Sequence, residues 1–149
     1  MIFGDFQCPY CTAAYPILRR VRDQLSERLM FAFRHFPLRD VHPDAQRAAE
    51  AAEAAAAQGA FWEMHDRMYD SRGALSRAEL ISHAAELGLD AERVATELDA
   101  SVHAPRVQRD VDSGLASGVM GTPAFFVGGR MHAGSFDAAS LIAALEASA

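Results

Sequence analysis

The sequence has few of the features that mark several common classes of protein. It contains only two cysteines, so there is no second cysteine pair, and none of its six histidines stands in a His-x3-5-His element. A structural zinc site needs four such ligands, and we therefore expect no metal. No apolar stretch is long enough to span a bilayer, so no membrane span is expected.

Runs of basic residues are also missing. Fourteen basic residues are set against twenty acidic ones, the formal net charge is −6, and the arginines are spread along the chain. A nucleic-acid surface needs clustered positive charge to meet the phosphates. We therefore expect no nucleic-acid partner.

The start of the chain lacks the basic region and the apolar region of a signal peptide. As written, the chain is expected to be cytoplasmic. Met1 stands at the very beginning of the first expected strand, however, which leaves no room for a leader. If a leader has been removed, the expectation becomes a periplasmic or other extracytoplasmic location.

What the sequence does contain is a Cys-x-x-Cys pair between a short apolar strand and a long helix. Apolar residues within 1–6 predict the strand, and helical apolar spacing begins at Tyr10. Cys8 thus stands at the helix start and Pro9 at the first position, where its missing N–H leaves nothing unpaired. A sulfur there faces free backbone N–H groups and the positive end of the helix dipole, which stabilise a thiolate. Cys8 is therefore the candidate nucleophile, and Cys11, one turn deeper and less exposed, is the candidate resolving thiol.

Two other uses of the pair are less favoured. A structural disulfide between Cys8 and Cys11 would close too short a loop to remove much chain entropy. A zinc site would need two further ligands, which the histidine spacing does not offer. Redox chemistry is the interpretation that remains, and it works in reducing and oxidising compartments alike.

The rest of the chain predicts a single α/β domain over 1–149, with enough residues to bury a real core. After the first helix, the apolar periodicity predicts a parallel strand over 30–36, helices between 43 and 118, a hairpin over 124–133 and a helix over 136–147. Within the helical block, Ser76 with Glu79 predicts a capping box, and Asp90 predicts the cap of the following helix.

This order of elements, with Cys-Pro-Tyr-Cys at the first helix and Gly-Thr-Pro before the hairpin, resembles the DsbA-like branch of the thioredoxin fold over nearly the whole chain. The stretches that carry the resemblance are residues 3–11, 33–38, 58–62 and 121–129. The resemblance implies a thioredoxin core over 1–40 and about 119–149. It also implies a helical insertion over about 41–118.

The resemblance further implies a substrate-binding role for Thr122 and Pro123. Pro123 would be cis and face the disulfide, and the Thr122 backbone would pair with an extended substrate segment as an added strand does. Many relatives carry an acidic residue six positions before the first cysteine, where this chain has Ile2. Asp5 is nearer to Cys8 in sequence, but we expect it to point to a different part of the strand.

Pro9 and Tyr10 are expected to help set the redox potential. Strong oxidases of the resembled family often have His beside the second cysteine, whereas Tyr10 cannot become cationic and should stabilise the Cys8 thiolate less. The expected potential lies between about −120 mV for DsbA and about −270 mV for thioredoxin.

The leading hypothesis is a thiol-disulfide oxidoreductase without a bound cofactor, in which Cys8 attacks a disulfide and Cys11 resolves the mixed disulfide. Its expected partners are protein or peptide thiols and disulfides, together with an unknown redox partner. The sequence does not identify the oligomeric state. An alternative is glutathione-linked chemistry, either as a glutaredoxin-like reductase or as an isomerase or transferase, with glutathione as co-substrate. The transferases generally carry Ser at the first active-site position, which counts against them.

A third, non-enzymatic hypothesis is a peptide-binding chaperone or a redox-sensing module. Phe61, Trp62 and Met64 would then form a hydrophobic groove, although such a stripe is more often part of a core. Similar domains occur fused to membrane transporters, but no apolar segment of this sequence supports such a fusion.

Overall fold

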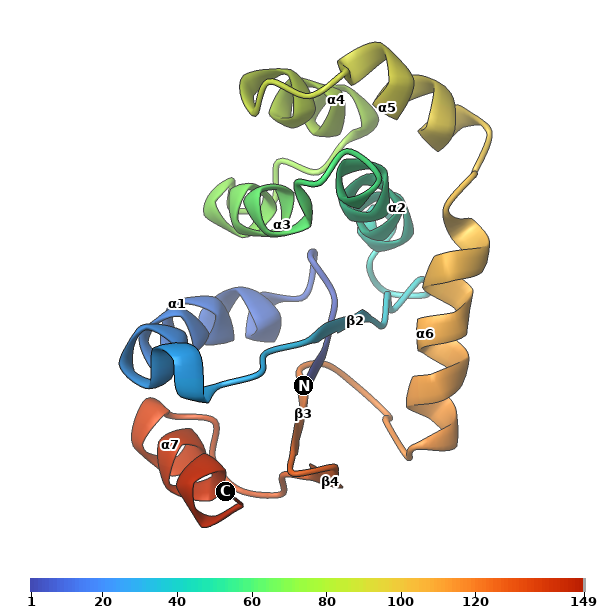
Figure 1. Cartoon of the computed structure of the whole chain (residues 1–149). Helices are drawn as coiled ribbons and strands as arrows, with labels where there is room; N and C mark the ends of the chain where they lie inside the picture. The colour runs from blue at the N-terminus through green and yellow to red at the C-terminus, as the bar shows by residue number, and fades with distance from the viewer. Residues whose placement is uncertain (149) are drawn as a thin grey trace.

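The computed structural model describes residues 1–148, which form one mixed four-stranded sheet covered by helices (Figure 1). The strands are β1 (Ile2–Gly4), β2 (Phe33–His35), β3 (Ala124–Val127) and β4 (Arg130–Met131). The helices are α1 (Pro9–Leu25), α2 (Ala45–Ala56), α3 (Phe61–Asp70), α4 (Arg77–Glu86), α5 (Ala91–Asp99), α6 (Ala104–Ala116) and α7 (Ala138–Ala147), with a short 3-10 helix η1 (Ser26–Arg28) after α1.

The strand order is β2-β1-β3-β4, so the strand that leads into the cysteine pair lies inside the sheet. β2 runs parallel to β1 and β3 runs antiparallel to it, with Ile2 opposite Phe33 on one side and Phe125 on the other. The expected parallel strand is confirmed, but it is shorter than the predicted 30–36. The reason is that β1 offers only three residues for pairing, which limits the ladder of β2 to the same length.

Helices cover both faces of the sheet (Figure 1). α1 and α7 lie on one face, where Ile2 and Phe125 join the larger hydrophobic core. α6 lies against the other face, where Phe3 and Phe126 pack with Phe36 and Val119. Because successive strand residues point to opposite faces, two neighbouring apolar residues in β1 and two in β3 supply both cores.

A close approach of α6 to the sheet depends on Gly114. A Cβ atom at this position would lie 2.7 Å from the ring of Phe36 and 3.1 Å from that of Phe3. Both distances are shorter than ordinary van der Waals contact. Glycine therefore lets the helix backbone rest directly on the two aromatic rings.

The predicted hairpin is confirmed, and its turn contains two glycines. β3 and β4 pair antiparallel, with Val127 opposite Arg130. Gly128 and Gly129 between them have φ values of 55° and 79°. A two-residue turn with two positive φ values matches the twist of the flanking strands, and glycine adopts it without steric cost.

The helical block contains α2 to α5 and continues into α6, and within 41–118 the described chain has no strand, as predicted. The capping box of Ser76 and Glu79 is present at the start of α4, and Asp90 caps α5 by accepting the N–H of Arg93. The alanine-rich α2 is the centre of the block. Its small side chains let neighbouring helices pack closely, and five of them are fully buried: Ala48, Ala51, Ala52, Ala54 and Ala55.

The aromatic and methionine stripe of α3 belongs mainly to the core. Met64 and Met68 are fully buried, while Phe61 and Trp62 are half-buried. Met64 therefore does not line a surface groove, and the groove expected for a chaperone lacks one of its three residues. The guanidinium of Arg22 on α1 lies 4.8 Å from the ring centroid of Trp62, which covers part of the remaining aromatic surface.

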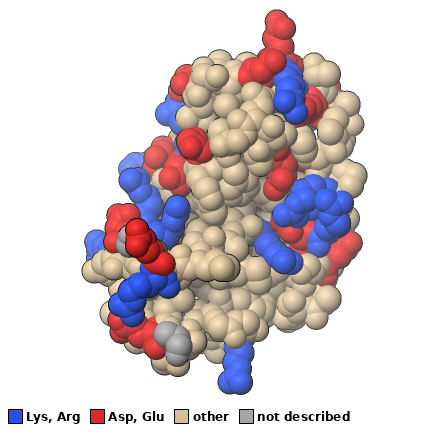
Figure 2. All heavy atoms as spheres, in the orientation of Figure 1, with Lys and Arg blue, Asp and Glu red and all other residues tan. Residues whose placement is uncertain are grey.

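Charged side chains of both signs are interspersed on the face of the molecule shown in Figure 2. No large basic area stands out on that face, in keeping with the net charge of −6. Over residues 1–148, none of the helices combines the length and the apolar character that a bilayer-crossing segment requires.

Candidate active site

Cys8 stands directly before the first residue of α1, as its sequence position predicts. Its carbonyl oxygen accepts the first helical hydrogen bond from the N–H of Thr12 at 3.0 Å, and Pro9 is the first helical residue. The free N–H groups at this end of α1 therefore lie close to the sulfur. Pro9 and Tyr10 are exposed at the rim of the site, with Tyr10 67% exposed.

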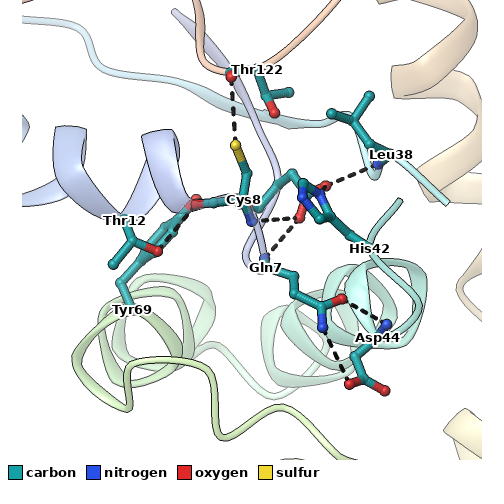
Figure 3. A network of polar contacts seen from close by, with 9 residues as sticks. Gln7, Cys8, Thr12, Leu38, His42, Asp44, Tyr69 and Thr122 are labelled. Atoms are coloured by element: carbon teal, nitrogen blue, oxygen red, sulfur yellow. Dashed lines mark hydrogen bonds and ion pairs between the residues drawn. The ribbon is translucent and has the colours of Figure 1, made fainter. Parts of the chain in front are cut away.

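The loop before β3 brings Thr122 to the sulfur from the other side. The Cys8 thiol donates a hydrogen bond to the Thr122 carbonyl oxygen at 3.5 Å (Figure 3). The peptide bond between Thr122 and Pro123 is cis, as the resemblance implies. The side-chain hydroxyl of Thr122 is buried and has no partner, so it can donate to a thiolate at Cys8.

The pKa values of the two cysteines are shifted in opposite directions. A hydrogen bond from the Cys11 thiol is the largest influence on Cys8 and outweighs its burial. With further help from the Thr122 side chain and the backbone of Cys11 and Tyr10, it holds the pKa of Cys8 at about 5. The same hydrogen bond, followed by burial, raises the pKa of Cys11 far above the ordinary thiol value. The arrangement thus favours a thiolate at Cys8 and a neutral thiol at Cys11.

The burial of Cys8 differs from the expectation that it would be the more exposed cysteine. Both cysteines are free thiols, and each residue is 2% exposed. Cys11 is nevertheless the more deeply packed of the two. Cys8 is covered because the loop at Thr122, which is 114 residues away in sequence, lies over it.

Asp5 is the residue of the site that sequence reasoning missed. Instead of pointing away from the cysteines, its buried carboxylate accepts four hydrogen bonds around the loop before α1. One oxygen, Oδ1, accepts the backbone N–H groups of Gln7 at 2.7 Å and Cys8 at 3.2 Å. The other, Oδ2, accepts the backbone N–H of Leu38 at 2.9 Å and the Nδ1–H of His42 at 2.7 Å.

One sequence signal could have pointed to Asp5. An aspartate two or three residues before a helix start often accepts the backbone N–H groups of that turn. The contacts with Leu38 and His42 had no such signal, because they join segments more than 30 residues apart. In the sequence alone, His42 is one of six histidines whose spacing argues against a zinc site.

A second contact ties the same two segments together. The Gln7 side chain donates to the carboxylate of Asp44 at 3.4 Å and accepts the backbone N–H of Asp44 at 2.8 Å. Figure 3 shows these bonds beside those of His42 and Leu38. The loop over 38–44 is therefore attached to the loop before α1 at several points.

The aromatic side chain of Tyr69 contacts the loop that precedes α1. The Tyr69 hydroxyl donates to the backbone carbonyl of Asp5 at 3.3 Å. Burial, with smaller contributions led by Cys11, raises the pKa of Tyr69 well above its ordinary value, so the phenol stays neutral.

Across residues 1–148, no three His, Cys, Asp or Glu side chains gather where they could hold a metal ion.

A family model and the solved structures of similar fold agree with the geometry of the site. The family model described as "DSBA-like thioredoxin domain" matches residues 1–146. A thioredoxin-like oxidoreductase from Silicibacter pomeroyi has a similar structure, with a TM-score of 0.86 and 25% identity over 98% of this chain and 83% of that one. BdbD from Bacillus subtilis has a TM-score of 0.88 at 18% identity, over 99% of this chain and 85% of that one, and shows likeness of fold alone.

Curated relatives carry a different kind of name. A protein of Salinispora arenicola named Na(+)/H(+) antiporter NhaA 1 is 48% identical over 143 residues, which are 96% of this chain and 22% of that protein. One of Herminiimonas arsenicoxydans named Na(+)/H(+) antiporter NhaA is 45% identical over 98% of this chain and 23% of that protein. The chain thus spans under a quarter of the length of these relatives.

Proposed function

The chain belongs to the DSBA-like thioredoxin domain family, a family of thiol-disulfide oxidoreductases, and we propose that it exchanges disulfides with protein or peptide thiols through Cys8 and Cys11. The mixed sheet and the solved structures confirm the expected α/β thioredoxin fold. The observation that carries the proposed chemistry is the position of Cys8 directly before α1, with its sulfur 3.5 Å from the Thr122 carbonyl oxygen and with the buried Cys11 one turn further along the helix. The lowered pKa of Cys8 agrees with this placement.

The proposed reaction of the reduced protein has two exchange steps. The Cys8 thiolate attacks one sulfur of a substrate disulfide, the substrate S–S bond breaks, and one substrate thiolate leaves. Cys11 then loses its proton and attacks the Cys8 sulfur, which releases the second substrate thiolate and forms the Cys8–Cys11 disulfide. Two electrons pass from the protein to the substrate. Starting from the oxidised protein, the same steps run in reverse.

Thr122 supports substrate binding in this proposal. The backbone of Thr122 lies beside the Cys8 sulfur, in the loop directly before β3. An extended peptide that pairs with this backbone, as an added strand does, would place its own sulfur next to Cys8. Binding through the main chain would select weakly among substrate sequences.

No bound cofactor is needed for the proposed exchange, but an external thiol or disulfide must restore the starting state. Either glutathione or a protein partner that carries a thiol or disulfide could perform this exchange. The direction of flux, and with it the compartment, would follow from the reduction potential. A potential near −120 mV suits a disulfide donor outside the cytoplasm, and one near −270 mV suits a cytoplasmic reductase.

Trapping of the mixed disulfide tests this function. The Cys11→Ser variant should accumulate a mixed disulfide between Cys8 and a peptide substrate, which mass spectrometry detects, because no resolving thiol is present. The Cys8→Ser variant should form none and should lose turnover. Equal turnover in the two variants would contradict the proposal.

The names of the relatives favour a second candidate, in which the domain senses redox state for a cation transporter. Proteins at 40–48% identity are named Na(+)/H(+) antiporters. We infer for this candidate that oxidation of Cys8 and Cys11 changes the conformation of the domain, with little catalysis. A sensor would show altered hydrogen exchange on oxidation and no multiple turnover with glutathione and excess peptide disulfide. Sustained turnover would support the enzyme instead.

A further inference from the structure

His42 and Asp5 form a contact next to the cysteine pair that the exchange reaction itself does not use. The Nδ1 atom of His42 lies 2.7 Å from Oδ2 of Asp5, and the Asp5 side chain has no exposed surface. A carboxylate that already accepts three backbone N–H groups is an acceptor only, so Nδ1 of His42 must carry the proton of this hydrogen bond. The His42 side chain is 17% exposed.

The two oxygens of Asp5 serve two different segments. Oδ1 accepts the N–H groups of Gln7 and Cys8, which sets the backbone that leads into α1. Oδ2 accepts donors from the loop over 38–44, namely the N–H of Leu38 and the imidazole of His42. The rotation of the carboxylate is therefore fixed by donors on both oxygens, and His42 supplies the only side-chain donor among those given above.

The position of this backbone affects the thiolate. Part of the depression of the pKa of Cys8 comes from the backbone of Tyr10 and Cys11, in the first turn of α1. These groups stabilise the sulfur only while the turn is held in place under it. A carboxylate that lost its imidazole partner would remain buried with three backbone donors in place of four, and it would be held less firmly against the Cys8 amide.

We propose that His42 is a positioning residue for Cys8 and acts through Asp5. It keeps the Asp5 carboxylate on the amides of Gln7 and Cys8, and thereby keeps the first turn of α1 aligned with the Cys8 sulfur. Asp5 is the charged group that contacts the His42 imidazole, and Asp44, two residues on, is bonded to Gln7. This role rests on the proposed function, because it acts on the reactivity of the same thiol.

The test compares the apparent pKa of Cys8 and the equilibrium with glutathione in His42→Ala and His42→Asn. His42→Ala removes the donor, so the pKa of Cys8 should rise. The equilibrium constant for exchange with glutathione should shift about tenfold toward the protein disulfide, which corresponds to a potential about 30 mV more negative. His42→Asn keeps an N–H donor of similar reach, and it should restore most of the loss.

His103 supplies a matched control. Its Nε2 lies 2.6 Å from Glu97 Oε2, and its side chain has the same 17% exposure as that of His42. His103→Ala should leave the glutathione equilibrium within twofold of the wild type. A shift of the same size in both alanine variants, or no shift in His42→Ala, would overturn the role of His42.

A measurement on the unaltered protein covers the case in which His42→Ala fails to fold. Coupling between two sites is reciprocal, so oxidation of Cys8 should change the environment of the His42 imidazole. The imidazole resonances of His42 should shift between the reduced and oxidised protein, whereas those of His103 should not. Unshifted His42 resonances would overturn the inference. A wild-type protein that exchanges with neither glutathione nor a peptide disulfide would instead overturn the proposed function.

Discussion

The Cys8 thiol donates to the carbonyl oxygen of Thr122 at 3.5 Å, across 114 residues of sequence. The hydroxyl group of the same residue is buried and has no partner in this structure. Donation from this hydroxyl to the Cys8 thiolate helps to lower the pKa of Cys8. Thr122 therefore contacts the sulfur with one group that accepts and one that donates. The two protonation states of Cys8 use different groups of Thr122.

Removing the Thr122 hydroxyl should make Cys8 less acidic. Thr122→Val keeps the shape of the side chain but loses the donor, and we expect the pKa of Cys8 to rise by roughly half a unit to one unit. The pH dependence of iodoacetamide alkylation measures this change, and Thr122→Ser should reverse it. Thr96→Val, at an exposed position on α5, is the control and should leave the profile unchanged.

The reduced protein should become more stable as the pH rises from about 5 to about 8.5. The pKa of Cys8 is about 5 in the folded state, against about 8.5 in an unfolded chain, so the unfolded state binds more protons in this window. The stabilisation is complete above the unfolded pKa and is lost as the pH falls through the folded one. It should amount to up to about 2.5 kcal/mol between pH 5 and pH 7.

Urea unfolding of the reduced protein at several pH values measures this effect. Cys8→Ser should lack the corresponding slope, because serine does not titrate. Above about pH 8.5 the trend should reverse, since the pKa of Cys11 is raised in the folded state and its neutral form is favoured there. A stability that rises equally in both proteins would assign the slope to other groups.

The hydrogen bond between His35 and Glu53 should contribute to stability mainly above pH 5. His35 Nε2 lies 2.8 Å from Glu53 Oε1 and joins β2 to α2. Burial is the largest single influence and opposes ionisation of Glu53. The hydrogen bond from His35 and the coulombic influence of neighbouring groups, Arg106 among them, together outweigh burial and hold the pKa of Glu53 below its ordinary value. A depressed carboxyl pKa stabilises the fold above the unfolded value and loses this effect as the pH falls.

Glu53→Gln should therefore reduce the free energy of unfolding by about 1–3 kcal/mol at pH 7. The difference from the wild type should shrink as the pH falls below the ordinary pKa of a glutamate carboxyl, about 4.3, and on through the lowered pKa of the folded state. Denaturant titrations at pH 7 and pH 3.5 measure both values. Glu63→Gln, an exposed substitution on α3, is the control and should change little at either pH.

Gly114→Ala should push α6 away from the sheet. The added Cβ would lie 2.7 Å from the buried ring of Phe36, which has little room to move, and we expect a loss of about 1–3 kcal/mol. Gly121→Ala adds the same atom where nothing lies within 4 Å, and it should cost much less. Thermal unfolding of the two variants compares them directly, and equal costs would count against close packing at Gly114.

Local signals in the sequence were sufficient to predict most of the helices. The Ser76 and Glu79 capping box and the Asp90 cap are contacts between residues three apart, so the residue types alone indicate them. The cysteine pair was placed correctly at the start of α1 for the same reason, because Pro9 marks a first helical position.

The parts that could not be predicted depend on contacts between distant segments. The burial of Cys8 requires the loop at Thr122, and the role of Asp5 requires Leu38 and His42 to return to the first strand. The length of β2 was overestimated because it is set by its partner β1 and not by its own apolar pattern. The division into a thioredoxin core and a helical insertion stays a prediction.

The order of the strands has a consequence for synthesis on the ribosome. β1 pairs with β2 about 30 residues later and with β3 more than 100 residues later, both counted from β1. Because chains emerge N-terminal end first, Cys8 leaves the ribosome long before the loop that covers it. A nascent chain that ends before β3 therefore carries an uncovered thiol without its Thr122 partner. The shielding of this thiol, and the part of its acidity that Thr122 supplies, are acquired only after the segment around Thr122 has emerged.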